Sequence, residues 1–147
     1  MTLLRAFEDS IRVEKHLFAL VDEECEADDV YATIPGVGEV ATEDDVVVVS
    51  SALEDQLARL RVEVWAGLPQ PLPGEWRPVS ADLAVRFSTG RVRVVNLLIE
   101  PETEDWALGS PGNYSVRVFA SGPEEPAAVQ TEAVGLVERY VVQFWSA

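Results

Sequence analysis

The chain has 147 residues, of which 48% are hydrophobic and 25% charged, with a formal net charge of −15. This length and composition suit one folded domain and exclude extensive disorder, whereas the negative charge disfavours direct contact with nucleic acid or an anionic membrane. One cysteine excludes an internal disulfide, and no apolar run indicates a signal peptide or membrane span, so we expect a cytoplasmic protein.

The negative charge is concentrated in the first third of the chain. Residues 1–56 carry 3 basic and 15 acidic side chains, whereas residues 57–122 carry 7 of each. This distribution favours a basic partner protein, because opposite potentials steer two proteins together. The ordinary alternative is that the acids only keep the protein in solution.

A helix and a strand are the first two predicted elements. Leu3, Phe7 and Ile11 recur at four-residue spacing, which predicts a short helix over residues 2–10. Apolar side chains then share one parity through residues 11–21, which predicts a single strand.

Two dense acidic runs follow, the first in the predicted exit loop of this strand. They comprise Asp22, Glu23, Glu24, Glu26, Asp28, Asp29, Glu43, Asp44 and Asp45. A calcium site is disfavoured because the EF-hand spacing and its central glycine are absent. We interpret the acids as either a solvated loop or an anionic recognition surface, and in the second case both runs should lie on one face.

Strands separated by turns are predicted in the middle of the chain. A proline and two glycines make residues 30–38 a turn-rich connection. Four consecutive valines at 46–49 predict a central strand that is covered on both faces. A short loop or helical turn at 50–57 is followed by a strand that runs to about residue 66.

A proline-rich stretch, residues 68–78, predicts a long surface connection, which Trp76 near its end should anchor to the domain. Trp65 lies just before this stretch. Tryptophan is frequent in interface hot spots, so both are candidate partner-binding residues, although tryptophans in a small domain usually pack in its body. One pocket lined by Trp65 and Trp76 would favour a small-ligand or carbohydrate-binding function instead.

The second half predicts a hairpin and two further strands. Alternation over residues 79–88 and 91–100, on either side of a Thr-Gly pair, predicts a hairpin. Alternation over 114–122 predicts a further strand, and a loop at 122–128 leads to the last predicted strand, residues 138–146.

These elements together predict an all-β protein. We expect a single-domain antiparallel β-sandwich over residues 1–147, with about seven or eight strands and at most one or two short helices. Whether the sheets pack as a sandwich or close as a barrel stays open.

No motif for catalysis accompanies this pattern. The single histidine, His16, lies in a predicted strand without a nucleophile elbow or metalloprotease motif. Glu23, Glu24 and Glu26 should raise the pKa of Cys25 and weaken it as a nucleophile. We therefore expect neither enzymatic activity nor a metal or cofactor.

Five segments of the chain carry a resemblance to known proteins. They are RVEVW, GEW, SADLAVRFSTGRVRVV, GSPGNYSVRVFASG and ERYVVQFW. Their order, from about Val46 to Ala147, resembles the bacterial competence protein J family and a wider set of actinobacterial domains of the same layout. The resemblance implies a non-catalytic protein that inhibits a partner nuclease by direct binding, but it supplies no motif of functional residues.

A protein–protein interaction module is therefore the favoured function. In its specific form, an acidic inhibitor or immunity protein binds a basic nuclease or toxin. The alternatives are a small-ligand or carbohydrate-binding sandwich and a structural or assembly protein, which a closed oligomer would support. The sequence leaves the partner's identity and the oligomeric state open.

Overall fold

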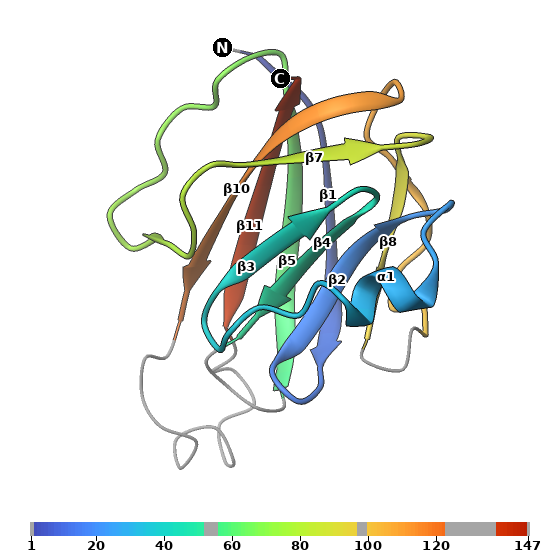
Figure 1. Ribbon diagram of the computed structural model, residues 1–147. Coiled ribbons are helices and arrows are strands. Elements are labelled where there is room, and N and C mark those ends of the chain that lie inside the picture. Colours follow the sequence, from blue (N-terminus) through green and yellow to red (C-terminus); the bar gives the residue numbers. More distant parts are fainter. Residues whose placement is uncertain (1, 52–55, 97–99, 123–137, 147) are drawn as a thin grey trace.

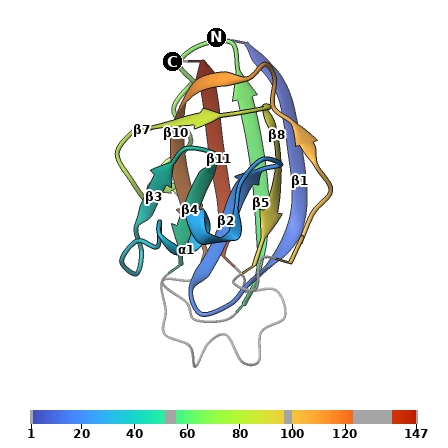
Figure 2. The ribbon, with the colours of Figure 1, turned by 45° about the vertical axis from the view of Figure 1, so that its right-hand side comes forward.

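The computed structural model describes residues 2–51, 56–96, 100–122 and 138–146. These residues form eleven strands and one short helix, arranged as two sheets packed face to face (Figures 1 and 2). The predicted all-β sandwich is confirmed, and within the described residues the sheets do not close into a barrel. Eleven strands replace the expected seven or eight, partly because two of them contain only two residues.

The larger sheet has six strands in the order β1-β5-β11-β10-β6, with β7 also paired to β10. Its strands are β1 (Leu3–Val13), β5 (Gln56–Trp65), β6 (Arg77–Pro78), β7 (Leu83–Phe87), β10 (Gly112–Ser121) and β11 (Arg139–Ser146). β11 runs parallel to β5, with Val142 opposite Val62, while the other pairs are antiparallel. The expected antiparallel sandwich thus includes one parallel pair, which the sequence does not reveal because side-chain alternation is the same in both strand directions.

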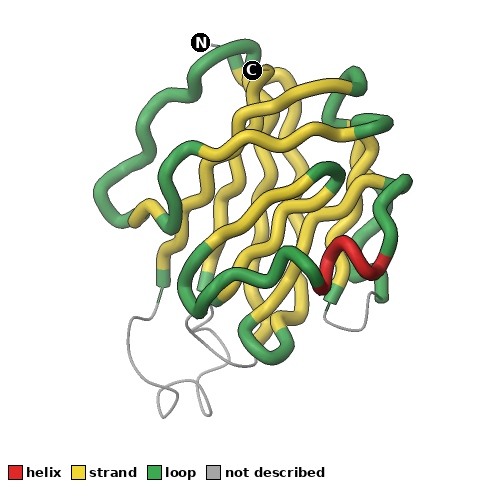
Figure 3. The backbone as a smooth tube through the Cα atoms, in the orientation of Figure 1, coloured by secondary structure: helices red, strands yellow, loops and turns green. Residues whose placement is uncertain are grey.

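The smaller sheet has the order β3-β4-β2-β8-β9. Its strands are β2 (Leu17–Asp22), β3 (Val40–Glu43), β4 (Val46–Ser50), β8 (Arg91–Val95) and β9 (Trp106–Ala107). The helix α1 (Ala27–Tyr31) lies over the outer face of this sheet (Figure 3). Its Val30 belongs to a buried cluster with Ala19 and Val48. No helix of the described chain has the length and apolar character needed to cross a membrane.

The main core lies between the two sheets. Val47 and Val49 of β4 face this core, while Val46 and Val48 lie in the smaller cluster beneath α1. The predicted strand with two covered faces is therefore confirmed. On the opposite sheet Phe144 meets Phe87 edge-on, with ring centroids 5.6 Å apart. Burying each such ring contributes roughly 2 kcal/mol to folding.

β1 replaces the helix predicted over residues 2–10. The strand pairs with β5 along its length, so that Phe7 lies opposite Val62 and Ile11 opposite Ala58. Successive side chains of a strand point to alternate faces, so residues four apart lie on the same face of a strand, as they also do on a helix. This ambiguity explains the error.

A tight turn interrupts the single strand predicted over residues 11–21. β1 ends at Val13 and β2 begins at Leu17, and between them Lys15 and His16 adopt left-handed φ values of 49° and 73°. The turn carries the chain from the larger sheet to the smaller one. Lys-His lacks the Asn-Gly or Asp-Gly signal of such turns, so the sequence did not indicate it.

The hairpin predicted over residues 79–100 is also wrong. β7 pairs with β10 in the larger sheet, whereas β8 pairs with β2 in the smaller one. Residues 88–90 therefore cross between sheets instead of reversing the chain within one. The strands predicted at 57–66, 114–122 and 138–146 are confirmed as β5, β10 and β11.

The proline-rich connection contains no regular element over residues 68–76, as predicted, but its last two residues form the short strand β6, which pairs with β10. Parts of other predictions lie outside the described residues. These are the turn at 52–55, the end of the second predicted hairpin strand at 97–99, and the loop from 123 onward.

Candidate functional site

Asp22, the first acid of the predicted recognition surface, is buried and has a structural role. It lies at the end of β2 and is 1% exposed. Its carboxylate accepts hydrogen bonds at 3.0 Å from the backbone N–H groups of Glu24, Thr89 and Gly90 and from the Thr89 hydroxyl. Gly90 has a φ of 82°, and a Cβ there would collide with the Gly109 carbonyl oxygen. Asp22 therefore holds one side of the crossing between β7 and β8.

Asp45 holds the other side of this crossing. Its carboxylate accepts hydrogen bonds from the Ser88 backbone N–H at 2.6 Å and from the Ser88 hydroxyl at 2.7 Å. Its own backbone N–H donates to the Arg86 carbonyl at 2.7 Å. Two of the nine predicted partner-binding acids are thus committed to contacts inside the protein.

The other seven acids are exposed around one end of the smaller sheet, and we call them the acidic edge. They are Glu23, Glu24, Glu26, Asp28, Asp29, Glu43 and Asp44. The two runs adjoin because the Asp22 N–H donates to the Asp45 carbonyl at 2.9 Å, next to the pairing of β2 with β4. Among the described residues, Glu23 alone of the seven forms an ion pair, with Arg91 at 3.8 Å.

Exposed apolar side chains follow the first acidic run along the chain, and the last of them, Val37, precedes the Glu39 carbonyl that accepts from the Ser50 N–H at the far end of β4. Tyr31, Ile34 and Val37 are 46%, 47% and 63% exposed. Tyr31 and Ile34 line a shallow apolar hollow above Leu17 and Ala19 on the outer face of the smaller sheet. Sequence reasoning missed these residues because it treated residues 30–38 only as a connection. Apolar residues at three-residue spacing within a turn-rich stretch were the available signal.

Cys25 lies within the first acidic run and is partly buried. Burial, followed by the charges of Asp29 and Asp45, raises the pKa of its thiol to about 11. The predicted direction of the pKa shift agrees, but its cause differs, because burial contributes most and, of the three predicted glutamates, only Glu26 contributes. One of the two carboxylates with the largest effect on this pKa, Asp45, belongs to the second acidic run.

The Cys25 thiol is expected to react slowly with alkylating reagents. A raised pKa leaves less thiolate at a given pH, so the rate with iodoacetamide at pH 8 should be about a hundredfold below that of free cysteine. The rate should rise about tenfold per pH unit, up to the pKa. Mass spectrometry of quenched samples from pH 7 to 10 measures this dependence. A rate that reaches a plateau near pH 8.5 would contradict the raised pKa.

Trp65 and Trp76 do not share a pocket. Trp65 donates from Nε1 to Glu63 Oε1 at 2.9 Å and lines a hollow of about 290 Å³ with Leu4 and Pro111. Trp76 lines a separate hollow of about 260 Å³ on the larger sheet. The condition that would have favoured a carbohydrate-binding site between the two tryptophans is therefore not met.

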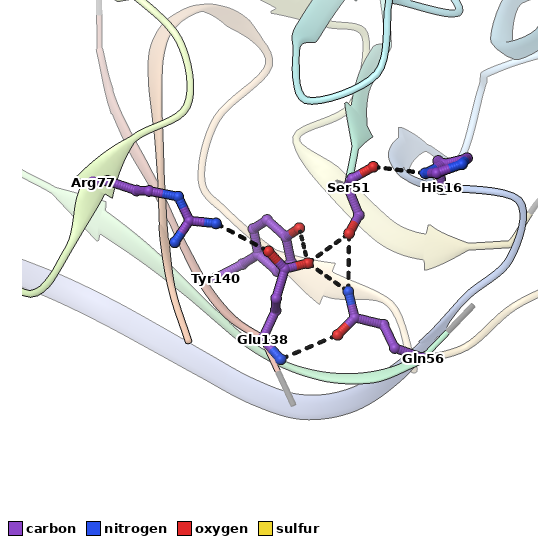
Figure 4. A network of polar contacts seen from close by, with 6 residues as sticks. All are labelled: His16, Ser51, Gln56, Arg77, Glu138 and Tyr140. Atoms are coloured by element: carbon purple, nitrogen blue, oxygen red, sulfur yellow. Dashed lines mark hydrogen bonds and ion pairs between the residues drawn. The ribbon is translucent and has the colours of Figure 1, made fainter. Parts of the chain in front are cut away.

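A buried polar network surrounds Glu138, at the entry to β11 (Figure 4). Its Oε1 accepts hydrogen bonds from the Ser51 hydroxyl at 2.5 Å, the Gln56 amide at 2.5 Å and the Tyr140 hydroxyl at 2.9 Å. Its Oε2 pairs with Arg77 at 3.1 Å. Burial, and then the charge of Glu138, raises the pKa of Tyr140.

This network brings a serine, a histidine and a carboxylate together without the geometry of a catalytic triad. His16 Nδ1 lies 2.9 Å from the backbone oxygen of Ser51, and the Ser51 hydroxyl donates to Glu138 (Figure 4). A serine nucleophile must donate its hydroxyl to the histidine that serves as base. The arrangement instead joins the end of β4 to the beginnings of β5 and β11.

Comparison with known proteins relates the chain to two solved structures. No protein-family model and no curated protein matches it. The crystal structure of ComJ from Bacillus subtilis, inhibitor of the DNA degrading activity of NucA, superposes with a TM-score of 0.67 at 8% identity, over 100% of both chains. Crocagin biosynthetic gene J superposes with a TM-score of 0.58 at 11% identity, over 99% of both chains. Identities this low relate folds and not activities. The predicted resemblance is confirmed at this level, and the chain has a ComJ-like fold.

Proposed function

We propose that this protein is a non-catalytic inhibitor or immunity protein that binds a basic partner through the acidic edge. A nuclease is the first candidate partner, and a toxin of another kind is the second. The fold shared with ComJ supports an inhibitor, because that protein inhibits a nuclease. The observation that carries the proposal is the convergence of seven exposed carboxylates, six of which form no ion pair within the described chain.

Electrostatics explains why such an edge suits a nuclease. An enzyme that binds DNA presents basic groups to the phosphates, and those groups also attract a dense array of carboxylates. Asp28 and Asp29 lie in the first turn of α1, where the helix dipole favours negative charge. The acids can therefore remain concentrated on this edge at little cost to folding.

Apolar contacts would supply much of the affinity. Interfaces commonly have an apolar centre surrounded by a polar rim, and the centre carries most of the binding energy. Tyr31 and Ile34, at the end of α1 and just after it, provide such a centre next to the acids of α1. The proposed contact does not include Trp65 or Trp76, whose hollows belong to the larger sheet.

Charge reversal within the acidic edge is expected to slow association. The double variant Glu24→Lys/Asp28→Lys should reduce the association rate with a purified candidate nuclease that the wild-type protein binds by about tenfold at low salt. It should also weaken the dependence of that rate on salt, because the attraction that salt screens is reduced. Surface plasmon resonance at several salt concentrations, together with a DNA-cleavage assay, measures both effects.

A matched control reverses two exposed acids elsewhere. Glu100→Lys/Glu104→Lys changes the net charge by the same amount and should reduce the rate much less. Equal rates and salt slopes for wild type and the acidic-edge variant would remove this edge from the interface. Cleavage unaffected by wild-type protein would reject this nuclease as the partner.

A further inference from the structure

The hollow that Trp76 lines is on the outer face of the larger sheet, away from the acidic edge. Its volume is about 260 Å³, and we call it the arginine hollow. Its lining side chains are Glu8, Arg59, Arg61, Trp76, Arg139 and Val141. Val141 is 3% exposed and provides an apolar surface between the arginines.

Two of these arginines are direct neighbours across strands. Arg59 of β5 lies opposite Arg139 of β11 in the parallel register, and Arg61 lies opposite Val141 two pairs further along, on the same face of the sheet. Like charges directly opposite each other in a sheet are destabilising. The chain nevertheless places three of its 11 basic residues around one hollow, despite a net charge of −15. Such a cost is typical of a binding site.

Carboxylates from the protein compensate the three arginines unequally. Arg61 pairs with Glu63 at 2.8 Å. The Glu8 carboxylate is shared, because it lies 2.9 Å from Arg61 and 4.0 Å from Arg59. Arg139 pairs with Glu75 at 3.2 Å. Arg59 is the least compensated of the three, because within the described residues its one ion pair is the 4.0 Å contact with Glu8. The side chains of Arg59 and Arg139 are 55% and 48% exposed, so an anion from solution can reach both.

An aromatic wall completes the site. The Arg139 guanidinium carbon lies 5.1 Å from the centroid of the Trp76 ring, which holds this arginine by a cation–π contact. Trp76 and Val141 together offer an apolar surface beside the charged groups. Convergent charged groups on an otherwise apolar surface are characteristic of small-molecule sites.

We propose that the arginine hollow binds a small organic anion, in which a planar ring carries a carboxylate or phosphate group. The guanidinium groups of Arg59 and Arg139 match either oxyanion, because each can donate two parallel hydrogen bonds. The ring contacts Trp76 and Val141. This site is independent of the partner proposed for the acidic edge.

Titration with three defined anions tests the site. Isophthalate supplies a ring with carboxylates, adenosine monophosphate supplies a ring with a phosphate, and inorganic phosphate lacks a ring. We expect isothermal titration calorimetry to detect saturable binding of at least one ring-bearing anion, about tenfold tighter than inorganic phosphate. The bound anion should also raise the melting temperature. Comparing isophthalate with adenosine monophosphate identifies the preferred oxyanion.

Single substitutions connect the binding to the arginines. Arg59→Gln and Arg139→Gln should each weaken the preferred anion about tenfold, since each removes a charge-assisted hydrogen bond. Neither should lower the melting temperature of the unliganded protein much, because each also relieves the repulsion between like charges. Arg93→Gln is the matched control, because Arg93 pairs with Asp105 at 2.9 Å on the smaller sheet.

The proposal has clear failure outcomes. It is overturned by the absence of saturable binding up to about 10 mM, the range of weak ligands. It is also overturned if Arg59→Gln and Arg139→Gln bind as tightly as Arg93→Gln. Equal affinity for inorganic phosphate and the ring-bearing anions would reject the role of Trp76 and Val141. None of these results bears on whether the acidic edge binds a nuclease.

Discussion

Replacing Glu138 with alanine is expected to lower the free energy of unfolding by about 4 kcal/mol. Glu138 is 1% exposed, and its carboxylate is the common acceptor for Ser51, Gln56, Tyr140 and Arg77. Without this carboxylate, the Arg77 guanidinium and the donors of Ser51, Gln56 and Tyr140 lose their common acceptor. Leaving buried donors and a charge unpaired costs more free energy than a single hydrogen bond contributes. Urea unfolding followed by tryptophan fluorescence measures the loss.

Tyr140→Phe is the matched control for this experiment. It removes one hydroxyl from the same network and keeps the ring that meets Phe18 at 5.2 Å, so it should cost only about 1 kcal/mol. If Glu138→Ala cost no more than Tyr140→Phe, the carboxylate would not be the centre of the network. A variant too unstable to fold agrees with the expectation, because a whole domain is stable by only about 5–15 kcal/mol.

The second large effect is expected at Asp22. Asp22→Ala should lower the free energy of unfolding by about 3 kcal/mol, because it leaves the backbone N–H groups of Thr89 and Gly90 without their acceptor in a buried crossing. Chemical denaturation in urea at neutral pH gives this value directly. The smaller sheet should be affected first, since Asp22 joins the end of β2 to the start of β8.

Asp28 provides the comparison within the same acidic run. Asp28→Ala changes the net charge equally, but its side chain is exposed, so the stability should change by no more than about 0.5 kcal/mol. Similar losses for the two variants would show that Asp22 contributes only as one charge among many. The opposite expectation holds for partner binding, where Asp28 and not Asp22 should matter.

Strand positions were predictable wherever a polar-apolar alternation met a packed face. β10 has this pattern, whereas the valine run of β4 indicated burial on both faces, and β11 is likewise buried along almost its whole length. Strand partners were less predictable, because pairing depends on contacts between distant residues. Thr89-Gly90 has the composition of a hairpin turn, but Asp22 and Asp45 hold it as a crossing between sheets.

The candidate site was predictable in composition and not in detail. The acidic runs are evident from the sequence, yet nothing local distinguishes buried Asp22 from exposed Glu23 beside it. The difference arises from donors 67 residues away along the chain. The arginine hollow was missed for the same reason, since Arg59 and Arg139 become neighbours only through the parallel pairing of β5 and β11.

The position of β11 has a consequence for synthesis of the protein on the ribosome. β11 lies between β5 and β10, so both of these strands have an unpaired edge until Arg139–Ser146 has been translated. Unpaired edges invite association with other chains. Pairing across a long stretch of chain, as between Val62 and Val142, also forms slowly. The nascent chain therefore has to be kept from aggregating until its last described strand closes the larger sheet.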